Sequence, residues 1–316
     1  MTSPLLARPG AVEADAPDAG VAAHYGDPYA EQRALAAAEA SVDLSHRPVV
    51  RITGPDRLSW LHSLLSQHVE RLAPGEWTQA LVLSPQGHVE HHLTLVDDGT
   101  QVLAHVEPGT AETLVTYLDR MRFMLRVEVA DVTEAYAVVH SGGQDRFVPR
   151  DSLASVDGPL AGVGAYEALR VEARRPRLGV DTDHRTIPHE VGWLGTAVHL
   201  DKGCYRGQET VARVYNLGRP PRRLVLLHLD GSDSELPATG DAVTLEGREV
   251  GRVGTAVRHH ELGPVALALV KSKVPDDAAL LAGAVAASID PEPSFEAPVS
   301  PARAAAAARE GLLRRR

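Results

Sequence analysis

The stretch Lys202-Gly203-Cys204-Tyr205-Arg206-Gly207-Gln208-Glu209 is the densest chemical pattern in this sequence of 316 residues. Its two glycines let the backbone turn sharply or approach a ligand closely, because glycine has no Cβ. Residues 208–214 favour a helix, which places Cys204 just before a helix N-terminus. Neighbouring cations and a helix N-terminus both stabilise a thiolate. Cys204 is therefore a candidate reactive thiol; the alternative is a small buried hydrophobic residue.

The composition is that of a globular protein, with 44% apolar and 23% charged residues. A net charge of −10 argues against general nucleic-acid binding. The single cysteine cannot form an internal disulfide. The longest apolar run is far shorter than the ~20 residues that cross a bilayer, and the first ten residues do not resemble a signal peptide. We expect a cytoplasmic protein of about two domains with no membrane partner.

The first half of the chain predicts an α+β domain at residues 43–145, after an N-terminal arm and a short helix in residues 1–42. The arm is expected to be loose up to about residue 28, and the helix to span 29–42. A largely antiparallel sheet is expected in the domain. Its expected strands are 48–52, 78–84, 88–96, 101–106, 125–129 and 135–140, with helices after Asp56 and at 110–121.

The second half predicts two further units and a tail. Residues 146–221 form a second α+β unit, with a helix at 166–173 and the Cys204 motif. Short strands and turns without a helix predict a small β-barrel in residues 222–290. Its expected strands are 224–229, 242–245, 250–258 and 265–270. Residues 291–316 are expected to be a flexible tail, with a possible helix at 302–316.

Two clusters of polar residues suggest binding sites. Residues 202–223 carry six basic side chains, and Glu209 is their only acidic residue. Such a cluster could bind a polyglutamate tail, a phosphate or an RNA backbone. The alternative is a charged face exposed to solvent. His88, His91 and His92 lie on one predicted strand, with His91 facing away from the other two. No motif supplies a third metal ligand, so we expect no metal there.

The motif at 202–209 resembles the K-G-C-Y-x-G-Q-E signature of the YgfZ-type folate-binding proteins, relatives of the glycine-cleavage T-protein, an aminomethyltransferase. The resemblance covers roughly residues 43–275. The matching motif positions are Lys202, Gly203, Cys204, Tyr205, Gly207, Gln208 and Glu209. Further matches lie at Asp43–His46 with Val50–Asp56, Leu169–Ala173 with Pro176 and Leu178–Asp181, and Ile187–Glu190.

This resemblance implies a fold and a ligand. The fold is a ring of three subdomains, two α+β units with antiparallel sheets and a C-terminal β-barrel, around a central pocket for tetrahydrofolate or a derivative. Glu172 would accept hydrogen bonds from the pterin, since a carboxylate can accept two N–H groups. Tyr166 would pack on the pterin. Arg213, from the basic segment, is a third candidate folate-binding residue.

The sequence also departs from the T-protein pattern. An acidic pair follows the first hairpin turn in the T-protein, whereas His91 and His92 stand there in this chain, after Glu90. An imidazole cannot replace a carboxylate that orients a developing cationic amine. We therefore expect no functional aminomethyl transfer. Arg174 replaces a glycine of the family pattern, and the T-protein lacks the cysteine found at Cys204.

Three functional hypotheses remain. The leading one is a folate-binding accessory protein that supports assembly or repair of iron–sulfur clusters, with transient client proteins and Cys204 as the working thiol. One thiol cannot hold a cluster that needs about four ligands, so its role would be transient. The second is a folate-dependent one-carbon transferase or demethylase. The third is a binding role in tRNA modification, which the net acidity disfavours.

Overall fold

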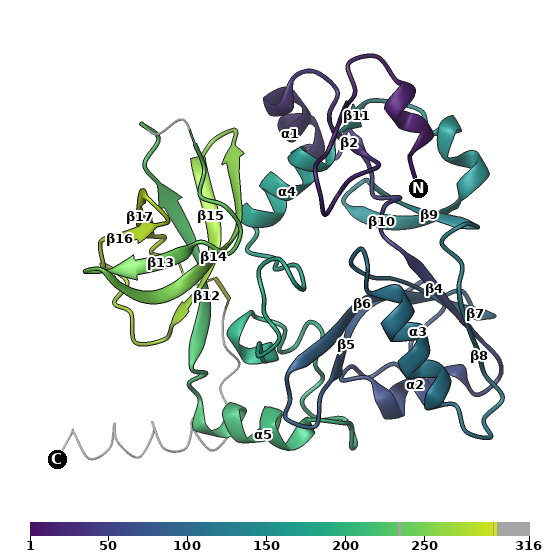
Figure 1. Cartoon of the computed structure of the whole chain (residues 1–316). Helices are drawn as coiled ribbons and strands as arrows, with labels where there is room; N and C mark the ends of the chain where they lie inside the picture. The colour runs from purple at the N-terminus through teal and green to yellow at the C-terminus, as the bar shows by residue number, and fades with distance from the viewer. Residues whose placement is uncertain (233–234, 293, 296–316) are drawn as a thin grey trace.

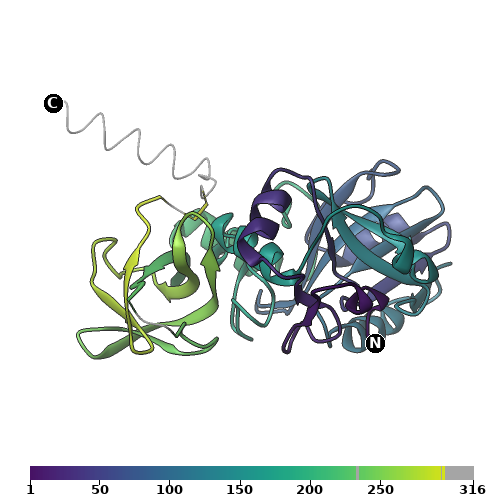
Figure 2. The ribbon, with the colours of Figure 1, turned by 90° about the horizontal axis from the view of Figure 1, so that it is seen from above.

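The computed structural model describes residues 1–232, 235–292 and 294–295. It contains two α+β units, each built on one sheet, and a closed barrel (Figure 1). Viewed from above, the barrel lies at one side of the molecule and the two sheets at the other (Figure 2). The expected α+β class with a C-terminal barrel is confirmed. The helix expected at 302–316 lies outside the described residues.

The first unit is a five-stranded antiparallel sheet in the order β5-β6-β7-β4-β8. Alternation along β6 places Leu93 and Leu95 in the core and leaves His92 and Thr94 on the opposite face. The strands are β4 (Val49–Thr53), β5 (Trp77–Leu83), β6 (Val89–Asp97), β7 (Gln101–His105) and β8 (Glu128–Asp131). The helices α2 (Arg57–Leu64) and α3 (Ala111–Arg120) contribute to its core.

The second unit is a four-stranded sheet in the order β10-β9-β3-β11. Its elements are β3 (Ser41–Asp43), β9 (Tyr136–Ser141), β10 (Gln144–Pro149) and β11 (Leu160–Ala161), with helices α1 (Pro28–Ala36) and α4 (Val163–Glu172) and the 3-10 helix η2 (Arg150–Ser155). The strand expected at 135–140 thus pairs with β3 and β10 instead of joining the first sheet. Gly142 and Gly143, both with positive φ, form the two-residue turn of the β9–β10 hairpin. This hairpin was not expected from the sequence.

The N-terminal segment is ordered, contrary to the expectation of a loose arm. It forms the 3-10 helix η1 (Pro4–Ala7) and the strands β1 (Val12–Glu13) and β2 (Ala22–His24). Leu5 and Val21 are almost fully buried, so apolar burial holds the segment on the second unit. The helix expected at 29–42 ends early, because Ala38 adopts a left-handed φ of 60° before β3 begins.

The last part of the chain contains the 3-10 helix η3 (Pro188–Glu190), the helix α5 (Gln208–Leu217) and the barrel. The barrel closes in the order β12-β15-β14-β13-β16-β17. Its strands are β12 (Arg222–Leu229), β13 (Ala242–Leu245), β14 (Arg248–His259), β15 (Gly263–Lys271), β16 (Leu280–Ala282) and β17 (Val285–Ile289). Two strands, β16 and β17, were not expected, since their apolar alternation is short and interrupted by alanines.

A buried arginine on α4 joins the second unit to the barrel. The guanidinium of Arg170 donates to Glu167 on the same helix, to Asp181 at 2.8 Å and to Thr255 of β14 at 2.6 Å. Its side chain is 3% exposed. Asp181 in turn accepts the backbone N–H of Thr255 at 2.7 Å. Burial alone would lower the pKa of Arg170, but the two carboxylates outweigh it and raise the pKa above the usual value.

We expect Arg170→Ala to destabilise the protein strongly, by about 3–5 kcal/mol, because it removes the arginine paired with the buried Asp181 and leaves Glu167 with Arg177 alone. Urea unfolding followed by circular dichroism measures the change. The matched control is Arg126→Ala, which removes an exposed arginine paired with Asp56 and is expected to leave the unfolding midpoint nearly unchanged. Equal midpoints for the two variants would contradict the structural role of Arg170.

Candidate functional site

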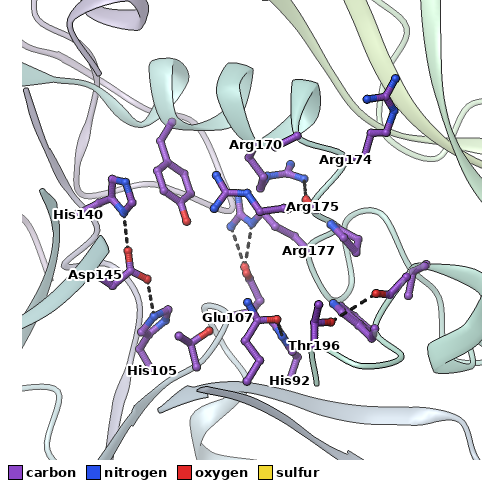
Figure 3. Close-up of a pocket in the computed structure, with 18 of the residues that line it drawn as sticks. His92, His105, Glu107, His140, Asp145, Arg170, Arg174, Arg175, Arg177 and Thr196 are labelled. Carbon is purple, nitrogen blue, oxygen red and sulfur yellow. Dashed lines mark hydrogen bonds and ion pairs between the residues drawn. The ribbon is translucent and has the colours of Figure 1, made fainter. Parts of the chain in front are cut away.

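A cavity of about 450 Å³ lies where the two sheets meet α4 and the segment that follows it (Figure 3). Its walls combine aromatic rings, histidines and arginines. The polar and aromatic lining includes Arg47, Trp77, Gln79, His92, Thr94, His105, Glu107, His140, Gln144, Asp145, Tyr166, Arg170, Arg174, Arg175, Arg177, Trp193, Thr196 and Phe295. This volume is in the range of sites that bind small molecules and cofactors.

Flat rings form two walls of the cavity. The imidazole of His92 stacks on the indole of Trp193, with ring centroids 4.8 Å apart and an angle of 17° between the planes. Tyr166 contacts His140 edge to face at 5.2 Å. The guanidinium of Arg175 lies 5.9 Å from the centre of the Tyr166 ring. Such surfaces suit a planar, heteroaromatic ligand, because stacked and edge-on contacts are favourable for π-systems.

A carboxylate between two imidazoles lines another wall. Asp145 accepts hydrogen bonds from Nε2 of His105 at 2.9 Å and from Nδ1 of His140 at 2.7 Å (Figure 3). Burial raises the pKa of Asp145, but the hydrogen bonds from the two histidines outweigh it and hold the pKa well below its usual range. Asp145 is therefore ionised at neutral pH and orients both imidazole rings.

The arginines of the cavity fall into two classes. Arg177 is 3% exposed and is fully engaged by Asp18 from the N-terminal segment and by Glu107 after β7. Arg175, by contrast, is exposed, and within the described residues no carboxylate lies at ion-pair distance from it. Arg174 beside it pairs with Asp290 at 2.7 Å. The buried arginines hold the fold, and Arg175 is available to an anionic group of a ligand.

The two histidines at the expected acidic positions are uncharged at neutral pH. Burial lowers the pKa of His91 to about 4, and burial lowers that of His92 to about 4 as well. His92 faces the cavity and contacts Gln79 at 3.1 Å, whereas His91 points into the core and its Nδ1 has no hydrogen-bond partner within the described chain. Neither side chain supplies the negative charge that a carboxylate would place here.

Lys202 of the motif is buried and fixes a loop of the first unit. Its Nζ donates to the carbonyl oxygens of His62 and Leu65 at 2.5 Å and of Gln67 at 3.3 Å. Burial lowers the pKa of Lys202 to about 8, so a large part of the population remains protonated at pH 7. Tyr205 packs in the core that joins the β5–β6 hairpin to the barrel.

Gly207 permits the closest approach of the motif to another element. It adopts a φ of 81° at the N-cap of α5, and a Cβ there would lie 2.6 Å from the carbonyl oxygen of Ser84. Gly87, in the β5–β6 turn, similarly faces Thr210 of α5. The hairpin turn and the start of α5 therefore pack without room for a side chain. Gly203 has open space around it.

Of the residues expected to hold folate, the cavity includes Tyr166 but not Glu172 or Arg213. Oε2 of Glu172 lies 3.3 Å from Nε2 of His259 on β14, and the side chain is 44% exposed. Arg213 is exposed on α5. The helical repeat explains the division, since Tyr166, Arg170 and Ala173 recur every three or four residues and share a face that Glu172 does not.

The remaining motif residues also lie away from the cavity lining. Cys204 is exposed and precedes the start of α5 at Gln208, as expected. Glu209 lies in the first turn of this helix, where a carboxylate is favourable. Arg174 occupies the glycine position of the family pattern with a left-handed φ of 53°, so the backbone turn after α4 is kept without glycine.

The basic segment 202–223 is not a continuous positive surface. Arg206 pairs with Glu90 at 3.1 Å, and Arg223 pairs with Asp276. Arg222 is held by Asp183 and Glu190. Three of the six cations are therefore paired with carboxylates from distant parts of the sequence, which the local charge count could not reveal. The expected anion-binding patch is reduced to the exposed arginines of α5 and the loop after it.

Comparisons with known proteins agree with this architecture. Residues 222–297 match the family model described as the CAF17 C-terminal β-barrel domain. A glycine cleavage system aminomethyltransferase T from Bartonella henselae has a structure similar to this chain, with a TM-score of 0.75 at 16% sequence identity. The superposition covers 93% of this chain and 97% of that one. The chain has an aminomethyltransferase-like fold with a CAF17-type barrel.

Curated proteins of the transferase and aminomethyltransferase type are also similar to this chain in sequence. A putative chloroplastic transferase of Arabidopsis thaliana is 24% identical over 268 residues, which is 67% of this chain and 60% of the relative. An aminomethyltransferase of a Nostoc species is 26% identical over 308 residues, covering 77% and 80%. One from Thermotoga neapolitana is 37% identical over 117 residues, covering 37% of this chain and 31% of that protein. None of the helices described here is both long and apolar enough for a membrane span.

We expect Gly207→Ala to destabilise this aminomethyltransferase-like fold, by about 1–3 kcal/mol, because the added methyl group meets a backbone carbonyl at a strained φ. Gly203→Ala, four residues earlier in the same motif, is the matched control and should change stability by much less. Thermal unfolding of both variants measures the difference. A loss for Gly203→Ala as large as that for Gly207→Ala would contradict the packing argument.

We also expect the protein to lose stability as the pH falls from about 6.5 to 4. A histidine with an unfolded pKa of 6.5 and a folded pKa of about 4 takes up its proton in the unfolded state first. For His91 alone the loss between pH 7 and pH 5 is about 2 kcal/mol. Urea unfolding at several pH values should show a shallower pH dependence for His91→Leu; an unchanged slope would contradict the assignment.

Proposed function

We propose that the cavity binds a reduced folate, tetrahydrofolate or a derivative. The observation that carries the proposal is the combination of a cavity of about 450 Å³ with stacked rings at His92 and Trp193 and an exposed arginine at its edge. A pterin would fit between the flat walls. The carboxylates of the glutamate tail would pair with Arg175. The kinship with proteins named aminomethyltransferases supports the same ligand class.

The proposed role excludes aminomethyl transfer as its main activity. That reaction needs a negative charge beside a developing cationic amine, and the resemblance places this charge at the positions of His91 and His92. Both imidazoles are neutral at pH 7, because burial depresses their pKa values. A neutral ring can accept a proton, but it does not provide the fixed negative field that stabilises such a cation. Folate binding without this transfer fits the residues better.

The proposal extends to an accessory role in iron–sulfur cluster assembly or repair. Cys204 is exposed and lies outside the cavity lining, so it is accessible to a macromolecular client rather than to the folate. It lies four residues before Gln208, the first residue of α5. One thiol would act only transiently on a cluster or on a client cysteine, since a cluster needs about four ligands.

A folate-dependent one-carbon transferase or demethylase is the second candidate. The relatives named aminomethyltransferase favour it, and so does the Asp145 carboxylate between two imidazoles. An imidazole oriented by this carboxylate could accept a proton from a substrate amine. A role in tRNA modification has less support, because carboxylates pair with three of the six cations of the basic segment.

We expect purified protein to bind tetrahydrofolate and its 5-formyl derivative with saturation at one site. Trp193→Ala should weaken binding at least 10-fold, because it removes one flat wall together with its stack on His92. Isothermal titration calorimetry measures both proteins. Arg213→Ala is the control and should bind like the wild type, since its side chain is exposed outside the cavity. Glu172→Gln tests the resemblance, which implies weaker binding.

The variant Cys204→Ser tests the accessory role in iron–sulfur cluster assembly separately from folate binding. This variant should bind folate normally but fail to restore the activity of iron–sulfur enzymes in cells that lack the gene. Full restoration by Cys204→Ser would remove the accessory role while leaving folate binding intact. The absence of saturable folate binding by the wild type would contradict the ligand assignment itself.

A further inference from the structure

A second cluster of ligand-type side chains lies on the first unit, apart from the cavity lining. His62 belongs to the last turn of α2, and His68 and Glu70 follow in the loop toward β5. One imidazole nitrogen of each histidine and one carboxylate oxygen of Glu70 all lie within 4.8 Å of one another. The two imidazole rings meet edge to face, with centroids 4.5 Å apart. None of the three residues belongs to the folate proposal.

The histidine on α2 has an unused nitrogen. Nδ1 of His62 is buried and has no hydrogen-bond partner within the part of the chain that the structure describes. A buried polar atom without a partner is costly, and an ion at this position would satisfy it. The three donor atoms already lie within 4.8 Å of one another, so small rotations about the χ angles would bring them to the separations that a metal requires.

The motif lysine holds the backbone of this loop in place. Lys202 donates to the carbonyls of His62, Leu65 and Gln67, so its ammonium group is directed at backbone oxygens next to two of the ligand residues. His199, whose Nδ1 accepts the backbone N–H of Asp201 at 3.2 Å, approaches His68 with ring centroids 5.5 Å apart. The segment that leads into the motif therefore borders the cluster and restricts its geometry.

We propose that His62, His68 and Glu70 bind a divalent transition-metal ion, with a further coordination position open to water or to an external ligand. Two imidazoles and one carboxylate are a donor set that suits Zn²⁺ and its neighbours in the first transition row. Ca²⁺ and Mg²⁺ prefer sites made of oxygen atoms and are expected to bind poorly. This site is independent of the folate cavity and of the thiol chemistry proposed for Cys204.

Titration of full-length, chelator-treated protein with Co²⁺ and Zn²⁺ tests the site. We expect one tight site per chain, a tetrahedral or five-coordinate Co²⁺ absorption spectrum, and displacement of Co²⁺ by Zn²⁺ but not by Mg²⁺. His68→Ala and Glu70→Gln should each weaken Zn²⁺ binding at least 10-fold. His184→Ala, which removes an exposed histidine elsewhere, is the matched control and should bind like the wild type.

A second measurement uses the wild-type protein alone, so that a folding defect in a variant cannot decide the result. Histidine modification by diethyl pyrocarbonate, read by peptide mass spectrometry, should be suppressed at His62 and His68 by one equivalent of Zn²⁺ and unchanged at His184. Equal affinities of the wild type and His68→Ala would overturn the proposal. Zn²⁺ protection absent from both His62 and His68 would overturn it as well.

Discussion

The buried ion pairs of Arg170 and Arg177 determine how the parts of this protein fit together. Arg170 joins α4 to Asp181 and to Thr255 of the barrel, and Arg177 joins the following loop to Asp18 and Glu107. The two side chains thus contact the N-terminal segment through Asp18, the loop after β7 through Glu107, and the barrel through Thr255. Charges removed from water need full pairing, so each partner restricts the position of the others. The cavity is the space that this arrangement leaves.

Some charged side chains of the cavity are paired within the protein, and others remain available to a ligand. Glu107 and Asp145, the carboxylates of the cavity wall, are occupied by Arg177 and by two histidines. Arg175, at the edge, faces no such partner among the described residues. A neutral planar ligand with an anionic tail is therefore a better match than a cationic one. This charge pattern agrees with a folate and opposes the stabilisation of a cationic amine.

Much of the fold could be predicted from sequence, because local patterns of apolar residues and turn glycines mark most of the strands and helices. The β5–β6 hairpin and α3 were expected close to their observed bounds, and so were most of the longer barrel strands. The order of the N-terminal segment was not expected, because its burial depends on Leu5 and Val21. These two residues lie far apart in the sequence and belong to no periodic apolar pattern. Tyr166 lines the cavity, and its contact with a folate stays a prediction. The positions of His105, Asp145 and Trp193 in the cavity arise from contacts between distant segments.

The β5–β6 hairpin contributes to two places at once. Near the middle of β6, His92 stacks on Trp193 inside the cavity. Two residues earlier, Glu90 pairs with Arg206, and the hairpin turn packs on Gly207, on the C-terminal side of the thiol of Cys204. An antiparallel pair of strands is stiff along its length, so a shift of His92 by a bound molecule would move the contacts beside the thiol. The hairpin thus connects the cavity wall directly to the segment that carries the surface cysteine.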